Sequence, residues 1–235
     1  MATKIQTSAE DMGYKSSATP SLTGVVAGRA LYCYIGGFLG TTPATAVSFS
    51  DDKGNTWAQA QFQSSVSKFS AIGYCENVTT GGTVTVTATP TGGTGTIFVT
   101  AVVIEYSGML ASGSLDKTTG QNYNGGSVTA FDTTATAVTT QAGELYTAVY
   151  AAGSFASDPT VTDTDATGAA PASGWVLDLN GGSQAEGVKL FIVSVFATLT
   201  EAAKSAITVS TGAGSFAACL ATFKEASSSP MFRGS

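Results

Sequence analysis

The sequence predicts an all-β protein made of two tandem antiparallel β-sandwich modules that arose by internal duplication. Apolar and polar residues alternate along much of the chain, as in residues 83–89, where valines face one side and threonines the other. No segment carries the 3.6-residue apolar stripe of an amphipathic helix. Similar segments also recur about 115 to 123 residues apart, and the only two tryptophans, Trp57 and Trp175, fall at matching places.

The repeat places each module along the chain. AGRALY at residues 27–32 is echoed by AGELY at residues 142–146. Each copy then reaches an Asp/Gly turn before its tryptophan and closes on an apolar strand, at 97–106 and at 216–223. Paired glycines, which supply the positive φ angles of tight turns, separate about six or seven strands in each copy. That number suits a jelly-roll or immunoglobulin-like sandwich.

The expected boundaries follow from these features. We expect an N-terminal arm at 1–19, module 1 at 20–108, a connector at 109–130, module 2 at 131–226 and a C-terminal tail at 227–235. Tails of such composition are usually disordered unless something holds them, such as a neighbouring subunit. Met231 and Phe232 are apolar residues in a polar tail, so we expect them to anchor the chain to a partner. The chain is therefore expected to act as a homo-oligomer or a lattice-bound subunit.

Composition and charge exclude several function classes. Charged residues make up 11% of the chain and the net charge is -6, with the basic residues scattered singly. No basic patch is available to neutralise phosphates, so we do not expect nucleic acid as a partner. The first residues lack the apolar run of a secretory signal, and no run approaches the length of about 18 residues that a membrane span needs. We expect synthesis in a cytoplasm and no membrane partner.

The chain contains no histidine, which removes the commonest general base and transition-metal ligand. Neither a nucleophile elbow nor a phosphate-binding loop is present. Glu105 ends the run at 102–108 on the same face as Val103, where a solvated or turn-bonding role is more common than catalysis. We therefore expect no enzymatic activity, no catalytic residue and no cofactor.

Two acidic segments are weak calcium candidates. Residues 163–168, DTDATG, match the opening of a calcium loop through Asp163 and Asp165, but the position that should hold a bidentate Glu is Gly174. Asp51 and Asp52, with Asn55, form a similar acidic turn in the first copy. A loose calcium site and ordinary Asx turns are both open for these segments, and Asx turns are the commoner outcome.

The tryptophans and cysteines each allow two interpretations. Trp57 and Trp175 could stack on sugar rings, but their matching positions favour equivalent places in two cores. The three cysteines, Cys33, Cys75 and Cys219, lie in strand-like runs without metal-binding spacing. Buried free thiols are favoured for them, with a Cys33–Cys75 bridge as the alternative.

Residues 47–57, VSFSDDKGNTW, and 104–108, IEYSG, resemble β-sandwich repeats of bacterial surface proteins and tailed-phage virion proteins. The second copy keeps the framework but has Ala169-Ala170-Pro171 after its turn glycine. The resemblance implies a structural protein of the virion, with an outer capsid decoration (cement) protein as the first choice. Such a protein would bridge shell subunits and bind the major capsid protein or other virion subunits. The alternative is a carbohydrate- or receptor-binding module, such as a tail-fibre domain, that uses the tryptophans.

Overall fold

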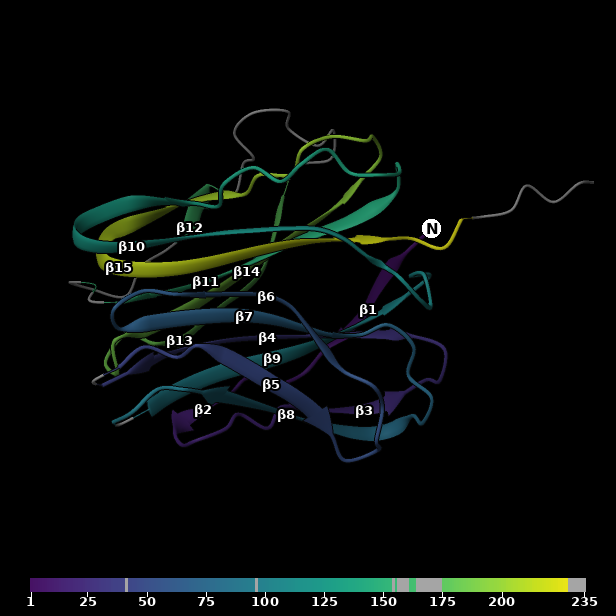
Figure 1. The fold of residues 1–235 in the computed structure, drawn as a ribbon, viewed down its shortest axis with the longest axis horizontal. Helices are drawn as coiled ribbons and strands as arrows, with labels where there is room; N and C mark the ends of the chain where they lie inside the picture. The colour runs from purple at the N-terminus through teal and green to yellow at the C-terminus, as the bar shows by residue number, and fades with distance from the viewer. Residues whose placement is uncertain (41, 96, 154, 156–160, 164–174, 228–235) are drawn as a thin grey trace, which may run out of the picture.

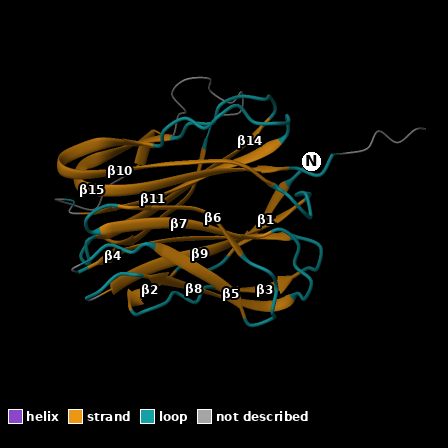
Figure 2. Cartoon of the chain, in the orientation of Figure 1, coloured by secondary structure: helices purple, strands orange, loops and turns teal. Residues whose placement is uncertain are grey.

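Figure 1 shows the computed structural model, which describes residues 1–40, 42–95, 97–153, 155, 161–163 and 175–227. Every regular element in these residues is a β-strand, and all strand pairs are antiparallel (Figure 2). The described residues form no helix, and so none that is long and apolar enough to cross a membrane. The expected all-β class is confirmed.

The N-terminal half forms two sheets. The first, inner sheet 1, contains β1 (Thr3–Thr7), β2 (Asp11–Tyr14), β4 (Ala30–Leu39), β6 (Ala58–Ser64), β7 (Lys68–Cys75) and β9 (Ile97–Ser107). Its order is β1-β9-β4-β7-β6, with β2 also paired to β9. The second, the outer sheet, contains β3 (Ser21–Val25), β5 (Ala46–Asp51) and β8 (Gly82–Thr91). Its order is β3-β8-β5, so β8 is the central strand.

The C-terminal half forms one sheet, inner sheet 2. It contains β10 (Leu115–Asp132), β11 (Glu144–Gly153), β12 (Val161–Asp163), β13 (Val176–Ser183), β14 (Val188–Ala197) and β15 (Ala206–Lys224). Its order is β10-β15-β11-β14-β13, with β12 also paired to β15. The pairing of β10 with β15 shifts register between Asn124 and Val128, beside Gly125 and Gly126, whose φ angles of 107° and 69° favour glycine.

Three apolar cores separate the layers. The first lies between the outer sheet and inner sheet 1 and joins Val84 of β8 to Leu31 of β4. The second joins Tyr150 of β11 to Ile207, near the start of β15. This first part of β15, paired with β12, covers the outer side of inner sheet 2. The third lies between the two inner sheets, which pack face to face (Figure 1). Because both faces of the inner sheets are covered, all ten residues of β11 are buried.

The core between the inner sheets is apolar, with a few polar links. Its buried members include Tyr32, Tyr34, Ile72, Ile104 and Tyr106 from inner sheet 1 and Leu145, Val149, Leu190, Ile192 and Phe223 from inner sheet 2. The hydroxyl of Thr147 donates to the Tyr34 oxygen at 3.0 Å. At the edges, Lys4 of β1 pairs with Asp178 of β13, and Glu10 accepts from the Gly182 amide at 2.6 Å.

The strand register repeats between the halves. In the N-terminal half, Tyr74 of β7 pairs with Tyr32 of β4 on one side and with Ala58 of β6 on the other. In the C-terminal half, Ser194 of β14 pairs in the same way with Thr147 of β11 and with Val176 of β13. Trp57 and Trp175 directly precede Ala58 and Val176, so their positions are equivalent. The bulge that Ala60 makes in β6 recurs at Asp178 in β13. Likewise, the bulge at Ile5 in β1 recurs at Asp116 in β10. Both inner sheets therefore share one strand order and these two bulges.

The structure moves two of the expected boundaries. The segment 1–19, expected to be an arm, supplies β1 and β2, which pair with β9 of the same chain. The segment 109–130, expected to be a connector, supplies most of β10, which pairs with β15. Both are polar edge strands, and such strands show little apolar alternation in a sequence. The N-terminal segment thus needs no neighbouring subunit to hold it.

The Leu-Tyr echo also misaligns the copies by one residue. Paired positions match Ala30 with Leu145, both in the core between the inner sheets. They match Leu31 with Tyr146, both in the cores that face outward. A shift of one residue moves every side chain of a strand to the other face. Gly28 and Gly143 therefore occupy equivalent positions in the two halves, and the two Leu-Tyr pairs do not.

Candidate functional site

The acidic turn after β5 is a closed hydrogen-bond cluster. One carboxylate oxygen of Asp51 accepts from the amides of Lys53 and Asn55, at 2.9 and 3.1 Å. The other accepts from Asn55 Nδ2 at 2.9 Å and from Trp57 Nε1 at 2.8 Å. Burial would raise the pKa of Asp51, but the bonds from Trp57 and Asn55 outweigh it and lower the pKa. Asp51 is therefore already saturated with donors.

The rest of this turn is equally occupied. Asn55 Oδ1 accepts from the amides of Thr79 and Thr80 at 2.8 and 3.0 Å. Asp52 accepts from the Thr85 amide at 2.8 Å and pairs with Lys53 at 3.1 Å. In the described residues no three Cys, Asp or Glu side chains gather in a way that could hold a metal ion. The bonds make this an Asx turn that ties β5 to β8, the alternative that the sequence favoured over a calcium site at Asp51, Asp52 and Asn55.

For one predicted site residue only the backbone is described, and three others lie outside the described part of the chain. Asp163 ends β12, where its backbone pairs with Thr208, and its side chain is not described. Asp165 lies outside the described residues, as do the expected anchors Met231 and Phe232.

The two tryptophans have equivalent positions and different surroundings. Trp175 is 6% exposed and packs in the core of the C-terminal half, 6.5 Å from the Tyr146 ring. Trp57 is only partly buried, and it stacks on Phe49 with ring centroids 6.4 Å apart. The expectation of two core tryptophans is therefore correct for Trp175 and only partly correct for Trp57.

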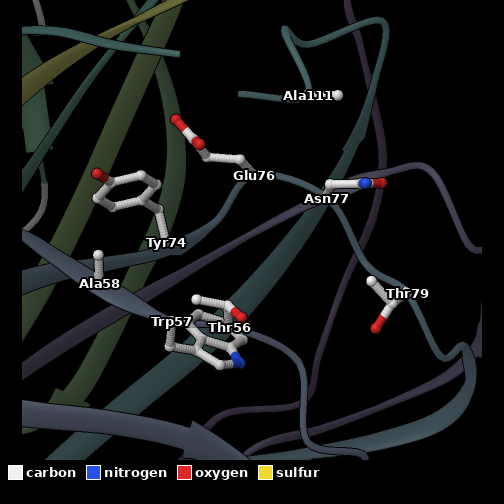
Figure 3. A pocket seen from close by; sticks show the side chains of 8 residues that line it. All are labelled: Thr56, Trp57, Ala58, Tyr74, Glu76, Asn77, Thr79 and Ala111. Carbon is white, nitrogen blue, oxygen red and sulfur yellow. The ribbon is translucent and has the colours of Figure 1, made fainter. Parts of the chain in front are cut away.

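Trp57 borders a hollow of about 280 Å³ at the end of inner sheet 1, shown in Figure 3. In that view Trp57 and Thr56 lie opposite Glu76 and Ala111. The lining comes from the start of β6 and the two residues before it, from the end of β7 and the loop after it, and from the segment between β9 and β10: Thr56, Trp57, Ala58, Tyr74, Glu76, Asn77, Thr79 and Ala111. Tyr74, Glu76, Asn77, Thr79 and Ala111 come close to Trp57 only in the folded chain, so the sequence did not connect them with it.

Glu76 fixes one wall of this hollow. Its carboxylate accepts from the Gly113 amide at 3.0 Å and from the Ser114 amide and hydroxyl at 2.5 and 2.8 Å. These bonds hold the segment that carries Ala111 against the end of β7. The opposite wall is held by the bond from Trp57 to Asp51. Both walls are therefore positioned by internal bonds.

Glu105 has a structural role. Its side chain is fully buried on the side of Val103, as the alternation predicted. It accepts from Gln6 Nε2 at 2.6 Å, from the Val26 amide at 3.1 Å and from Arg29 Nη1 at 3.2 Å. Glu105 thus bonds the turn before β4 and strand β1 to β9. The turn-bonding interpretation is confirmed, and the solvated one is wrong.

A second buried carboxyl, Glu144, occupies the position equivalent to Arg29 and was not identified from the sequence. Burial raises its pKa to about 7, and the nearby Asp116 adds to the rise. Burial alone would raise the pKa of Asp116 too, but its bonds from Thr140 outweigh this and lower the pKa to about 2. The pair therefore carries one proton over a wide range of pH.

The three cysteines are free and buried, so the alternative of a Cys33–Cys75 bridge is wrong. Burial raises the pKa of Cys75 to about 11 and that of Cys219 to about 12. Cys219 Sγ lies 3.3 Å from the Ser70 hydroxyl across the core between the inner sheets. The thiols are therefore packing residues.

No family model, no curated protein and no solved structure matches this chain.

Proposed function

We propose that the chain is a structural virion protein, an outer capsid decoration protein that bridges subunits of the capsid shell. We further propose that its two halves are β-sandwich modules produced by an internal duplication. The repeated strand order, the repeated bulges and the equivalent tryptophans support the duplication. The observation that carries the function is the apolar core that joins the two inner sheets face to face. It makes one block out of two modules, with two unlike outer faces.

The outer surface of this block suits broad contacts. The exposed side of β8 presents a row of threonines, and charged residues are scarce in the whole chain. Contact with such a surface requires few charges to lose their water, which lowers the cost of burial. A contact of about 800 Å² per partner is typical of a specific interface, and repetition over a lattice adds avidity. We propose the major capsid protein or other virion subunits as partners, with further copies of this chain in a homo-oligomer.

Antibody labelling tests the location. Antibodies raised against the purified chain should label virions evenly over the capsid surface in electron micrographs. Labelling restricted to the tail would favour the tail-fibre alternative over the decoration role. Intact virions without any label would contradict the proposal.

The C-terminal tail can be tested separately as the anchor. A chain that ends at Ser227 keeps the bond from the Ala226 amide to the Gly108 carbonyl, and so should fold normally. It lacks Met231 and Phe232, so binding to shells without the protein should weaken. Unchanged binding by the shortened chain would contradict the anchor and leave the rest of the proposal in place. The full-length chain is the control.

A further inference from the structure

The hollow beside Trp57 has a counterpart in the C-terminal half that serves as an internal comparison. That second hollow, about 410 Å³, shares three equivalent lining positions with the first and is also lined by Met1 and Lys4 of the N-terminal segment. Ser194 takes the place of Tyr74 and Val176 that of Ala58. Phe196 lies two residues after Ser194, as Glu76 lies two residues after Tyr74, so Phe196 takes the place of Glu76. The fold therefore makes a hollow at this place twice, but Trp175, the equivalent of Trp57, is buried and does not line the second one.

The first hollow has the groups that bind sugars. The ring of Trp57, bonded to Asp51 and stacked on Phe49, gives an aromatic wall of fixed orientation. Such a wall suits the apolar face of a pyranose. The Asn77 side chain is exposed, and an amide both donates and accepts, which matches paired sugar hydroxyls. The Thr56 hydroxyl lies beside Trp57, and Asn77 lies on the opposite part of the lining, next to Glu76 (Figure 3).

The charge of the lining selects among sugars. Glu76 is its only charged residue, and no Lys or Arg lines the hollow to neutralise an acidic ligand. A phosphate, a uronic acid or a sialic acid would meet a carboxylate without a compensating cation. The volume accommodates a single ring with its hydroxyls and no longer segment of a chain.

We propose that the hollow formed by Trp57, Tyr74, Asn77 and Thr56 binds one neutral pyranose residue at the end of a glycan. Asn77 and Thr56 bond the sugar hydroxyls, and the indole of Trp57 contacts the apolar face of the ring. This site is separate from the proposed shell contacts and does not depend on them.

A glycan array and NMR titration test the site with the full-length chain. The array should identify at least one glycan with a neutral terminal sugar, and the corresponding methyl glycoside should bind with a Kd on the order of 1 mM. The two tryptophan indole N–H signals form a built-in control. The Trp57 signal should shift on titration, and that of the buried Trp175 should not.

Asn77→Ala is the decisive variant, because Asn77 is exposed and its loss should leave the fold intact. It should weaken binding about five- to tenfold through the lost hydrogen bonds. Asn122→Ala is the matched control and should bind as the parent does. Asn122 lies in β10 and bonds to Gln63, at the end of β6 that is far from the hollow. The proposal is overturned if no neutral glycan binds, if only acidic glycans bind, or if Asn77→Ala binds unchanged.

Discussion

Replacing Phe223 with alanine should destabilise both halves of the molecule together. Phe223 belongs to β15 of the C-terminal half and is fully buried. Its ring lies 4.4 Å from that of Tyr32 and 5.4 Å from that of Tyr74, both in the N-terminal half. Removing a buried Phe side chain costs about 3 to 5 kcal/mol. With a urea m-value of about 3 kcal/mol/M for a chain of this size, the unfolding midpoint should fall by about 1 to 2 M.

Each half contains one tryptophan, so the assay can follow the halves separately. Urea unfolding is measured by fluorescence in two backgrounds, Trp175→Phe for the N-terminal half and Trp57→Phe for the other. Phe223→Ala should lower the midpoint in both. Phe131→Ala, the same change inside the C-terminal core, should also do so, because the fused sheets unfold as one unit. If the Trp57 signal kept its midpoint in either variant, the halves would be independent and the reasoning refuted.

Three further predictions concern single groups. Asn55→Ala should lower the free energy of unfolding by about 1 to 3 kcal/mol, because the Thr79 and Thr80 amides lose their acceptor. Added calcium should leave the melting temperature of the parent protein unchanged, and a calcium-dependent rise would support a metal site at this turn. Burial raises the pKa of Glu144 from 4.5 to about 7, so the folded state binds this proton more tightly than the unfolded state. Its contribution to stability is therefore complete below pH 4.5 and lost as the pH rises to about 7. Glu144→Gln should remove that slope from urea unfolding measured across this range, and an unchanged slope would assign it to another group. The three cysteines should resist a thiol reagent such as DTNB until the chain unfolds, and rapid labelling of native protein would show that their cores open.

The sequence predicted the all-β class and the repeated tryptophan position because both depend on local patterns. The alternation in residues 83–89 is that of β8, whose valines enter the core and whose threonines face outward. The tryptophan echo marks equivalent positions even in the strand register. These signals suffice because a period of two and a rare residue are visible without knowledge of the partner strands.

The face-to-face packing and the hollow could not be predicted in the same way, because they depend on which distant strands become neighbours. One signal was present: continuous apolar runs such as 190–193 indicate strands covered on both faces. Edge strands β1 and β10 gave no such signal, since their polar residues resemble those of a tail or a linker. Tyr74 and Asn77 become candidates for a sugar site only through their place beside Trp57.

The copy number of the chain in purified virions tests the proposed function most directly. Quantitative mass spectrometry of intact particles, with the major capsid protein as the internal standard, would give the ratio of the two chains. A decoration protein that bridges shell subunits should occur in a fixed ratio to the major capsid protein and in comparable abundance. Absence of the chain from the particles, or its presence in only a few copies at the level of a tail component, would contradict the account.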